Sequence, residues 1–234
     1  MAAQSKNGKL FLFLLVAIIG GAAGYGFFTQ NTASAPNAES AAAAPSAKER
    51  AAQQALLAAK PSDIILGDSN ALTTIVEYSS MSCSHCASFH EKVLPTLKKE
   101  FIDTGKAKLV LRHFPLNEPA LKASSIVECA GTLGLERTKF MDVFFNLQAQ
   151  WAFGESFLAD LKKIALVGGI DSAAFDSCLA DPAIEARLLT MRADAAKTLG
   201  VNSTPSFFVN GKKLDMPSIE AFREAINAAQ PASK

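Results

Sequence analysis

The sequence lacks an excess of charge of either sign, with 23 basic and 22 acidic residues among 234. It also lacks a basic stripe with interleaved aromatic residues, so the composition does not favour nucleic-acid binding. Tracts rich in methionine or histidine are absent as well, which argues against a metal carrier. Hydrophobic residues make up 49% of the chain, enough for one packed domain with an N-terminal extension.

Near the N-terminus, no charge occurs between Leu10 and Glu39. Two lysines precede a compact apolar block over residues 10–19, and small residues follow it, which is the layout of an export signal. We therefore predict that residues 1–35 form a cleaved signal peptide or, if uncleaved, a membrane anchor through residues 10–28. No cysteine follows the apolar block, which excludes a lipoprotein anchor. Either outcome places the rest of the chain beyond the membrane, where disulfides persist.

A linker and a short helical arm are expected over residues 36–62. The first part is rich in alanine, serine, asparagine and proline, and residues 48–60 have the composition of a helix that Pro61 closes. Two interpretations of this helix stay open. It is either a lone solvated helix or an arm for oligomerisation.

The remaining chain alternates between strand and helix patterns and predicts an α/β protein. Its order of elements is that of a thioredoxin fold, residues 63–116 and 183–230, interrupted by a helical domain at residues 117–182. Strands are expected at residues 64–67, 72–78, 108–114, 206–209 and 212–214, and helices from Cys83 to about residue 103, in several segments of 117–180, and at 183–199 and 218–229.

Cys83 and Cys86 stand where a predicted strand passes into a helix. Because a helix N-terminus favours a thiolate, we expect Cys83 at the exposed tip to be the nucleophile and Cys86, one turn further, to resolve the mixed disulfide. His85 between them, if protonated, would stabilise the thiolate and so the reduced form, which makes a stronger oxidant. Two alternatives stay open: half of a zinc site with His85 and His90, or a short structural disulfide.

A second motif is the proline at position 205, which heads the predicted strand at residues 206–209. A proline there indicates a tight turn or a cis peptide bond, and an ordinary strand start is the alternative. Its position downstream of the Cys-x-x-Cys motif, just ahead of the final strands and helix, favours the cis bond.

Together these motifs resemble the DsbA-like family of bacterial periplasmic thiol:disulfide oxidoreductases. The resemblance covers about residues 63–229 and rests on four stretches: Ile65-Leu66-Gly67-Asp68, Thr74-Ile75-Val76-Glu77-Tyr78, Met81-Ser82-Cys83-Ser84-His85-Cys86, and Gly200-Val201-Asn202-Ser203-Thr204-Pro205-Ser206-Phe207-Phe208-Val209-Asn210-Gly211.

The resemblance implies roles for residues around the cysteines. Pro205 would be a cis-proline packed against the redox pair, and Thr204 and Ser84 would contact an extended client peptide. Glu77 would be a buried acid that tunes the proton of Cys86, with a solvated strand glutamate as the alternative. His113 is interpreted as a surface or capping residue.

The resemblance also implies a periplasmic enzyme without a cofactor or metal, which introduces disulfides into reduced exported proteins and is turned over by a membrane redox partner. Two departures bear on the direction of the reaction. Ser84 replaces the proline of the best-known oxidases, and Thr204 is more similar to the disulfide isomerases. A disulfide isomerase or reductase therefore stays as the alternative, with a metal-binding carrier behind it.

The two other cysteines, Cys129 and Cys178, lie on apolar faces of predicted helices in the inserted domain. In an oxidising compartment we expect them to form a structural disulfide, and a second disulfide of this kind in some members of the family supports the pairing. Buried free thiols and a regulatory pair are the alternatives. Around the motif, Met81, Phe89 and Phe207 would form either an apolar rim for clients or part of the core.

Overall fold

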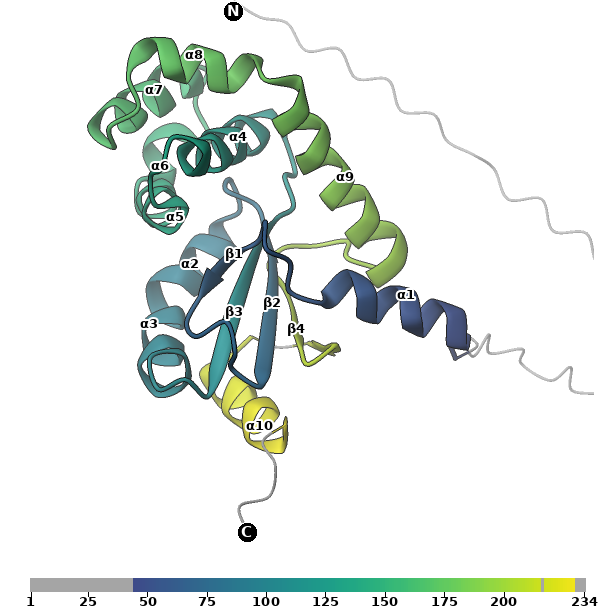
Figure 1. Cartoon of the computed structure of the whole chain (residues 1–234). Coiled ribbons are helices and arrows are strands. Elements are labelled where there is room, and N and C mark those ends of the chain that lie inside the picture. The colour runs from purple at the N-terminus through teal and green to yellow at the C-terminus, as the bar shows by residue number, and fades with distance from the viewer. Residues whose placement is uncertain (1–43, 216, 230–234) are drawn as a thin grey trace, which may run out of the picture. The chain divides into compact units, whose positions relative to one another are not determined.

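The computed structural model describes residues 44–215 and 217–229 (Figure 1). The predicted signal or anchor of residues 1–35 therefore lies outside the described residues. The helices and strands follow in this order: α1 (Ala47–Leu57), β1 (Ile64–Leu66), β2 (Thr73–Ser79), α2 (Ser84–Lys92), α3 (Leu94–Leu97), the π-helical turn η1 (Lys98–Ile102), β3 (Ala107–His113), α4 (Glu118–Thr132), α5 (Arg137–Asn146), α6 (Gln148–Trp151), α7 (Phe157–Val167), α8 (Ser172–Ala180), α9 (Pro182–Leu199), β4 (Ser206–Val209), β5 (Lys212–Leu214) and α10 (Ile219–Ala229).

The strands form one mixed sheet in the order β1-β3-β2-β4-β5, in which only β2 and β3 run parallel. A parallel pair needs a crossover connection, and α2 and α3 supply it between β2 and β3. The last two strands form a hairpin at Asn210 and Gly211, whose φ angles of 46° and 83° suit the turn that closes a two-residue hairpin. The α/β class predicted from the sequence is confirmed.

Alternation along β2 divides its side chains between two hydrophobic cores. Ile75 packs into the larger core with helix α2 and the inserted helices, whereas Val76 and Tyr78 pack into a smaller core with α1 and α9. Figure 1 shows the same division, with α2 and α3 on one side of the sheet and α1 and α9 on the other. By the same alternation, Glu77 points to the side of Ile75.

The helix expected from Cys83 to about residue 103 is interrupted, so this prediction is wrong in its continuity. Helix α2 ends at Lys92, α3 begins at Leu94, and a π-helical turn completes the segment. Pro95 stands in the first turn of α3, where its missing N–H costs no hydrogen bond, whereas in the middle of a helix its ring would clash with the preceding turn. A similar break at Leu147 separates α5 from α6.

Helix α1 is neither free nor solvated on all sides, so the lone-helix interpretation of residues 48–60 is wrong. A capping box of Ser46 and Glu49 starts the helix, and Leu57 at its end is buried in the smaller core. The Gln53 amide donates to the carbonyl of Thr198 at 3.1 Å, which ties α1 to the end of α9, beside it in Figure 1. Helix α1 is therefore packed against the rest of the domain.

Arg112 on β3 caps the C-terminal end of helix α1 from the interior of the protein. Its guanidinium donates to the carbonyls of Leu56 and Ala58, at 2.6 and 2.8 Å, and forms a two-pronged ion pair with the buried Asp63. It also donates to the hydroxyl of Tyr78 at 3.1 Å. These partners use all three guanidinium nitrogens, which explains how a charge that is 2% exposed is tolerated.

The surface interpretation of His113 is wrong, because this histidine is 1% exposed. Its Nε2 lies 3.3 Å from Oε1 of Glu128, a carboxylate on α4 that also pairs with Arg137 on α5 and Arg187 on α9. Burial raises the pKa of Glu128, but His113 and the two arginines outweigh it and lower the pKa to about 2. This cluster joins four elements on the boundary between sheet and inserted helices.

The inserted domain comprises helices α4 to α8. The expected disulfide between Cys129 and Cys178 joins α4 to α8, and the Cα atoms of the two cysteines are 5.6 Å apart. Trp151 is fully buried among these helices, and its indole N–H donates to the carbonyl of Phe144 at 2.9 Å. Within residues 44–215 and 217–229, none of the helices has both the length and the apolar character needed to cross a bilayer.

Candidate active site

Cys83 and Cys86 lie at the start of helix α2, as the sequence predicts. Cys83 is the N-cap residue, half-buried, and Cys86 is fully buried one turn into the helix. Both are free thiols. Because Cys83 precedes the helix at its exposed end while Cys86 faces the core, only Cys83 of the two is placed to meet a thiol or disulfide from outside.

The surroundings of the two thiols move their pKa values in opposite directions. A hydrogen bond from the Cys86 thiol, together with the backbone N–H groups of Cys86 and His85, outweighs burial and lowers the pKa of Cys83 to about 5. Burial is the main cause that raises the pKa of Cys86, and the hydrogen bond to Cys83 and the negative charge of Glu77 add to it. At neutral pH Cys83 is therefore a thiolate and Cys86 a thiol.

A loop from the other end of the domain completes the site. The peptide bond between Thr204 and Pro205 is cis, as predicted, and both residues are half-buried. When protonated, the Cys83 thiol donates to the Thr204 carbonyl oxygen at 3.2 Å. The Thr204 hydroxyl is buried and has no hydrogen-bond partner within the described part of the chain.

Glu77 lies fully buried on the α2 side of the sheet, so it is not a solvated strand glutamate. Its neighbours across the strands are Leu111 and Phe207, which offer the carboxylate no polar partner. Nε2 of His90 lies 3.2 Å from Oε2 of Glu77, and the imidazole is only 4% exposed. The sequence suggested His90 only as a metal ligand, because its contact with Glu77 exists only where α2 packs on β2.

Gln148 on α6 also belongs to the site, although no sequence motif marks it. Its side-chain amide donates to the carbonyl oxygens of Met81 and Cys83, at 2.8 and 3.0 Å, and the residue is 5% exposed. An inserted helix thus holds the loop that carries the nucleophile. The available signal was a polar residue one turn after Phe144 and one turn before Trp151, on an apolar helical face.

Comparison with known proteins agrees with this geometry. The family model described as thioredoxin matches residues 59–228. The crystal structure of Wolbachia pipientis alpha-DsbA1 superposes with a TM-score of 0.70 at 30% identity, covering 76% of this chain and 95% of that one. The chain is a DsbA-like member of the thioredoxin family. Its predicted thioredoxin-like fold with additional helices is thereby confirmed.

Two further relatives bear on this DsbA-like protein. A provisionally named protein-disulfide oxidoreductase of Rickettsia prowazekii is 33% identical over 167 residues, which are 71% of this chain and 61% of the relative. The chain thus spans less than two thirds of that relative. Oxidised BdbD from Bacillus subtilis, at 19% identity and a TM-score of 0.64, shares the fold and covers 72% of this chain and 92% of its own.

The other predicted site residues of the DsbA-like protein lie as follows. Ser84 and His85 are exposed beside Cys83, and His85 acts on the Cys83 thiolate through its backbone N–H. The candidate zinc ligands His85 and His90 do not converge on one point, because His90 points inward to Glu77 while His85 is exposed. Within the described ranges, no group of three or more histidine, cysteine or acidic side chains is arranged to hold a metal ion.

The apolar residues around the motif belong to the core of the DsbA-like protein. Met81, Phe89 and Phe207 are at most 3% exposed, so the alternative of an apolar rim for clients is wrong for these three side chains. Phe89 and Phe207 pack with ring centroids 4.5 Å apart. Core packing is therefore the correct interpretation.

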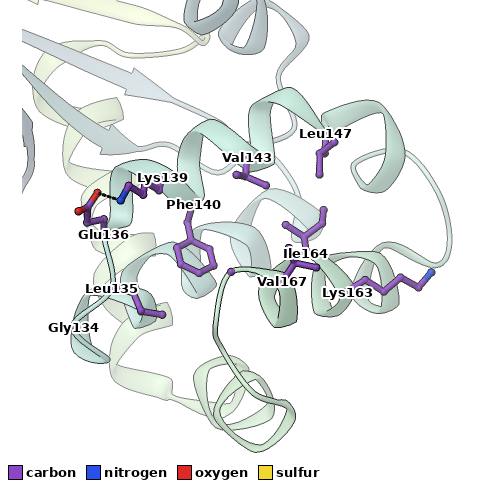
Figure 2. Close-up of a pocket in the computed structure, with 11 residues that line it drawn as sticks. Gly134, Leu135, Glu136, Lys139, Phe140, Val143, Leu147, Lys163, Ile164 and Val167 are labelled. Carbon is purple, nitrogen blue, oxygen red and sulfur yellow. Dashed lines mark ion pairs between the residues drawn. The ribbon is translucent and has the colours of Figure 1, made fainter.

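An apolar cavity of about 640 Å³ lies in the inserted domain rather than at the cysteines. Figure 2 shows Phe140 and Val143 of α5 facing Ile164 and Val167 of α7 across it, with the side chain of Lys163 extending away. None of the thiol-site residues lines this cavity.

Proposed function

We propose that this DsbA-like protein is a dithiol oxidase that donates the Cys83–Cys86 disulfide to reduced exported proteins. A client thiolate attacks Cys83 Sγ in the oxidised enzyme, and Cys86 leaves. A second client thiolate then attacks the client sulfur of the mixed disulfide and releases Cys83 as a thiolate. The client gains a disulfide, and the enzyme gains two electrons and becomes a dithiol.

The observation that carries this proposal is the opposite displacement of the two thiol pKa values. A Cys83 pKa of about 5 makes the thiolate a good leaving group and stabilises the reduced enzyme. A stabilised reduced form favours transfer of the disulfide to the client. The burial that raises the pKa of Cys86 leaves Cys83 as the one exchange partner for external thiols.

The location and partners belong to the same proposal. The apolar segment of residues 10–28, preceded by Lys6 and Lys9, supports export to the periplasm, either as a free protein or tethered to the inner membrane. The clients are reduced or unfolded exported proteins, and a membrane redox partner would reoxidise Cys86 and Cys83 after each transfer. Ser84 and Thr204 would contact the client chain beside its cysteine.

An isomerase or reductase is the second candidate, and Thr204 is the observation that favours it. The Thr204 carbonyl accepts from the protonated Cys83 thiol, and this contact is lost when the thiolate forms. It therefore opposes the oxidising tendency that the lowered Cys83 pKa gives to the enzyme. An isomerase would also need a second copy to enclose a client, and residues 36–60 are the candidate for that contact.

The reduction potential decides between the two candidates. We expect glutathione equilibration of the purified protein to give a value well above the glutathione poise, towards the figure of about −120 mV known for DsbA. A value near about −270 mV, as in thioredoxin, would make the protein a reductase or a reduced isomerase and would overturn the oxidase proposal. Cys83→Ser and Cys86→Ser variants serve as controls without a redox pair.

A further inference from the structure

The buried pair of Glu77 and His90 has a feature that a purely structural ion pair would not need. Oε2 of Glu77 is held by Nε2 of His90 at 3.2 Å, whereas Oε1, equally buried, has no hydrogen-bond partner among residues 44–215 and 217–229. A buried carboxylate oxygen without a partner is costly, by about 1–3 kcal/mol in typical proteins. Such an atom in a site that exchanges protons is a candidate acceptor.

We propose that His90 is a positioning residue of the thiol site, which holds Oε2 of Glu77 so that Oε1 stays free to exchange a proton with the Cys86 thiol. This inference rests on the proposed disulfide exchange at Cys83 and Cys86 and names a residue that governs the step in which the bond between Cys86 and Cys83 forms or breaks. It concerns the resolving thiol in either direction of the reaction.

The elements place these three groups on one side of the sheet. His90 follows Cys86 by four residues in α2, so both side chains lie on the same face of the helix, one turn apart. Glu77 belongs to the face of β2 that α2 covers, and its negative charge contributes to the raised pKa of Cys86. The carboxylate therefore acts on the thiol and contacts the imidazole at the same time.

Packing fixes the imidazole of His90 in place. Its ring lies 4.3 Å from that of Phe145 on α5 and 5.5 Å from that of Phe89. The titratable groups that face it are Glu77 from β2 and Asp142 from α5, and burial raises the pKa of Asp142. Aromatic rings on two elements thus prevent the imidazole from turning away from Glu77.

The hydrogen-bonding pattern also fixes which nitrogen of His90 carries the proton. A carboxylate can only accept, so Nε2 must donate to it. Nδ1 is buried and has no partner among the described residues, and a bare lone pair there costs less than an N–H without an acceptor. The imidazole is therefore set up as a donor to Oε2, and Oε1 keeps its lone pairs for the Cys86 proton.

The resolving step needs no reactant other than Cys86, Glu77 and the mixed disulfide between Cys83 and the client. The Cys86 S–H bond breaks as Oε1 of Glu77 takes the proton, and the Cys86 thiolate attacks Cys83 Sγ in the mixed disulfide. The bond between Cys83 and the client sulfur breaks, and its electron pair leaves with the client as a thiolate. In the opposite direction, protonated Glu77 returns the proton to Cys86 as that sulfur leaves Cys83.

The test separates the two steps of exchange in one reaction of the full-length reduced protein with an aromatic disulfide that releases a coloured thiolate. Attack by Cys83 releases the first thiolate, and attack by Cys86 on the resulting mixed disulfide releases the second. We expect His90→Phe, which keeps the ring packing but has no N–H donor, to slow the second release at least about tenfold. This is less than the roughly 10²–10⁴-fold that general acid–base catalysis typically contributes, because Glu77 itself is still present. The first release should change less than about twofold.

Four further variants make the result specific. His90→Gln keeps a side-chain N–H donor and should bring the second release back to within about threefold of the parent. Glu77→Gln should slow the same release, and the double variant with His90→Phe should be no slower than the slower single variant, because both substitutions act through one group. His113→Gln, which alters the other buried histidine paired with a glutamate, is the matched control and should leave both releases unchanged.

The proposal is overturned if folded His90→Phe resolves within about twofold of the parent, if both releases slow equally, or if the losses in the double variant multiply. Should His90→Phe not fold, His90→Met, which also lacks a donor, replaces it. A parent protein with two normal releases but a thioredoxin-like potential would refute the oxidase direction and leave the role of His90 standing. A parent without a second release would refute the exchange function itself.

Discussion

At the scale of single residues, three positions along one helix separate two identical functional groups. Cys83 at the N-cap meets the free N–H groups of the first turn, and Cys86 one turn later meets the core. The same hydrogen bond, from the Cys86 thiol to Cys83, lowers one pKa and raises the other. The half-buried Cys83 is thus the nucleophile and the fully buried Cys86 the resolving thiol.

This coupling gives a prediction about the Cys83 thiolate. In Cys86→Ala the pKa of Cys83 should rise by about 1 unit or more from its value of about 5, because the hydrogen bond that lowers it most is lost. Ultraviolet absorbance of the thiolate during a pH titration measures it. Cys86→Ser keeps an O–H donor and should shift the midpoint less. A midpoint that stays near pH 5 in Cys86→Ala would contradict the assigned cause.

At the scale of elements, buried charged groups join segments whose contact the apolar pattern alone does not fix. Arg112 on β3 holds the end of α1, and Glu128 on α4 gathers partners from β3, α5 and α9. Each cluster lies where apolar packing meets a helix end or a domain boundary. Removing one member leaves the others buried and unpaired, which is the costly outcome.

The docking of α1 gives the second prediction. Arg112→Met should lower the free energy of unfolding by about 3–5 kcal/mol, because Asp63 and the carbonyls of Leu56 and Ala58 lose their donor. Denaturant unfolding measures the loss, and hydrogen exchange should show α1 losing protection first. Lys48→Met, on the exposed side of α1, is the control and should change stability by less than about 0.5 kcal/mol. An unchanged α1 would contradict the capping role of Arg112.

The Glu128 cluster gives a prediction about acid stability. The folded pKa of about 2 lies below the unfolded value of about 4.3, so this carboxylate stabilises the protein fully above about pH 5 and loses its contribution as the pH falls towards 2. The contribution is about 3 kcal/mol. Between pH 5 and pH 2 the stability of the parent should therefore fall more steeply than that of Glu128→Gln. Parallel unfolding curves for the two proteins would refute the shift.

At the scale of the whole molecule, the inserted helical domain is stabilised by its own covalent link. The disulfide between Cys129 and Cys178 closes a loop with a sequence separation of 49. Loop-closure entropy gives about 4 kcal/mol for a loop of this length. The link joins α4 to α8, whereas the exchange site is built from α2, β2 and the loop before β4.

This separation gives the last prediction. The double variant Cys129→Ala, Cys178→Ala should lose about 4 kcal/mol of unfolding free energy while the Cys83 thiolate keeps its pKa and its rate of attack. Calorimetric or denaturant unfolding measures the first quantity, and alkylation kinetics measure the second. The single variant Cys178→Ala reports whether the loss comes from the link. If the Cys83 pKa moved as well, the two cysteine pairs would be coupled.

Local patterns in the sequence were sufficient for the order of elements and for the pair of Cys83 and Cys86. The cis bond at Pro205 was expected from its place relative to the other motifs, and the pairing of Cys129 with Cys178 from the oxidising compartment and the family resemblance. Alternation, helical spacing and turn residues act over a few positions, so they are readable in the chain itself. The break at Pro95 was also readable there, because a proline within an apolar helical pattern ends or kinks a helix.

Only the tertiary structure decided the partners of the buried polar groups. His90 meets Glu77 across 13 positions, Arg112 meets α1 across 54 and 56, and Gln148 meets the loop of Cys83 across 65. Each of these groups pairs with an atom that the fold brings from another element, and a buried polar group must find such a partner wherever the packing leaves one. The chain itself thus specified the chemistry of the thiols, and the packing of sheet and inserted helices selected the residues that control it.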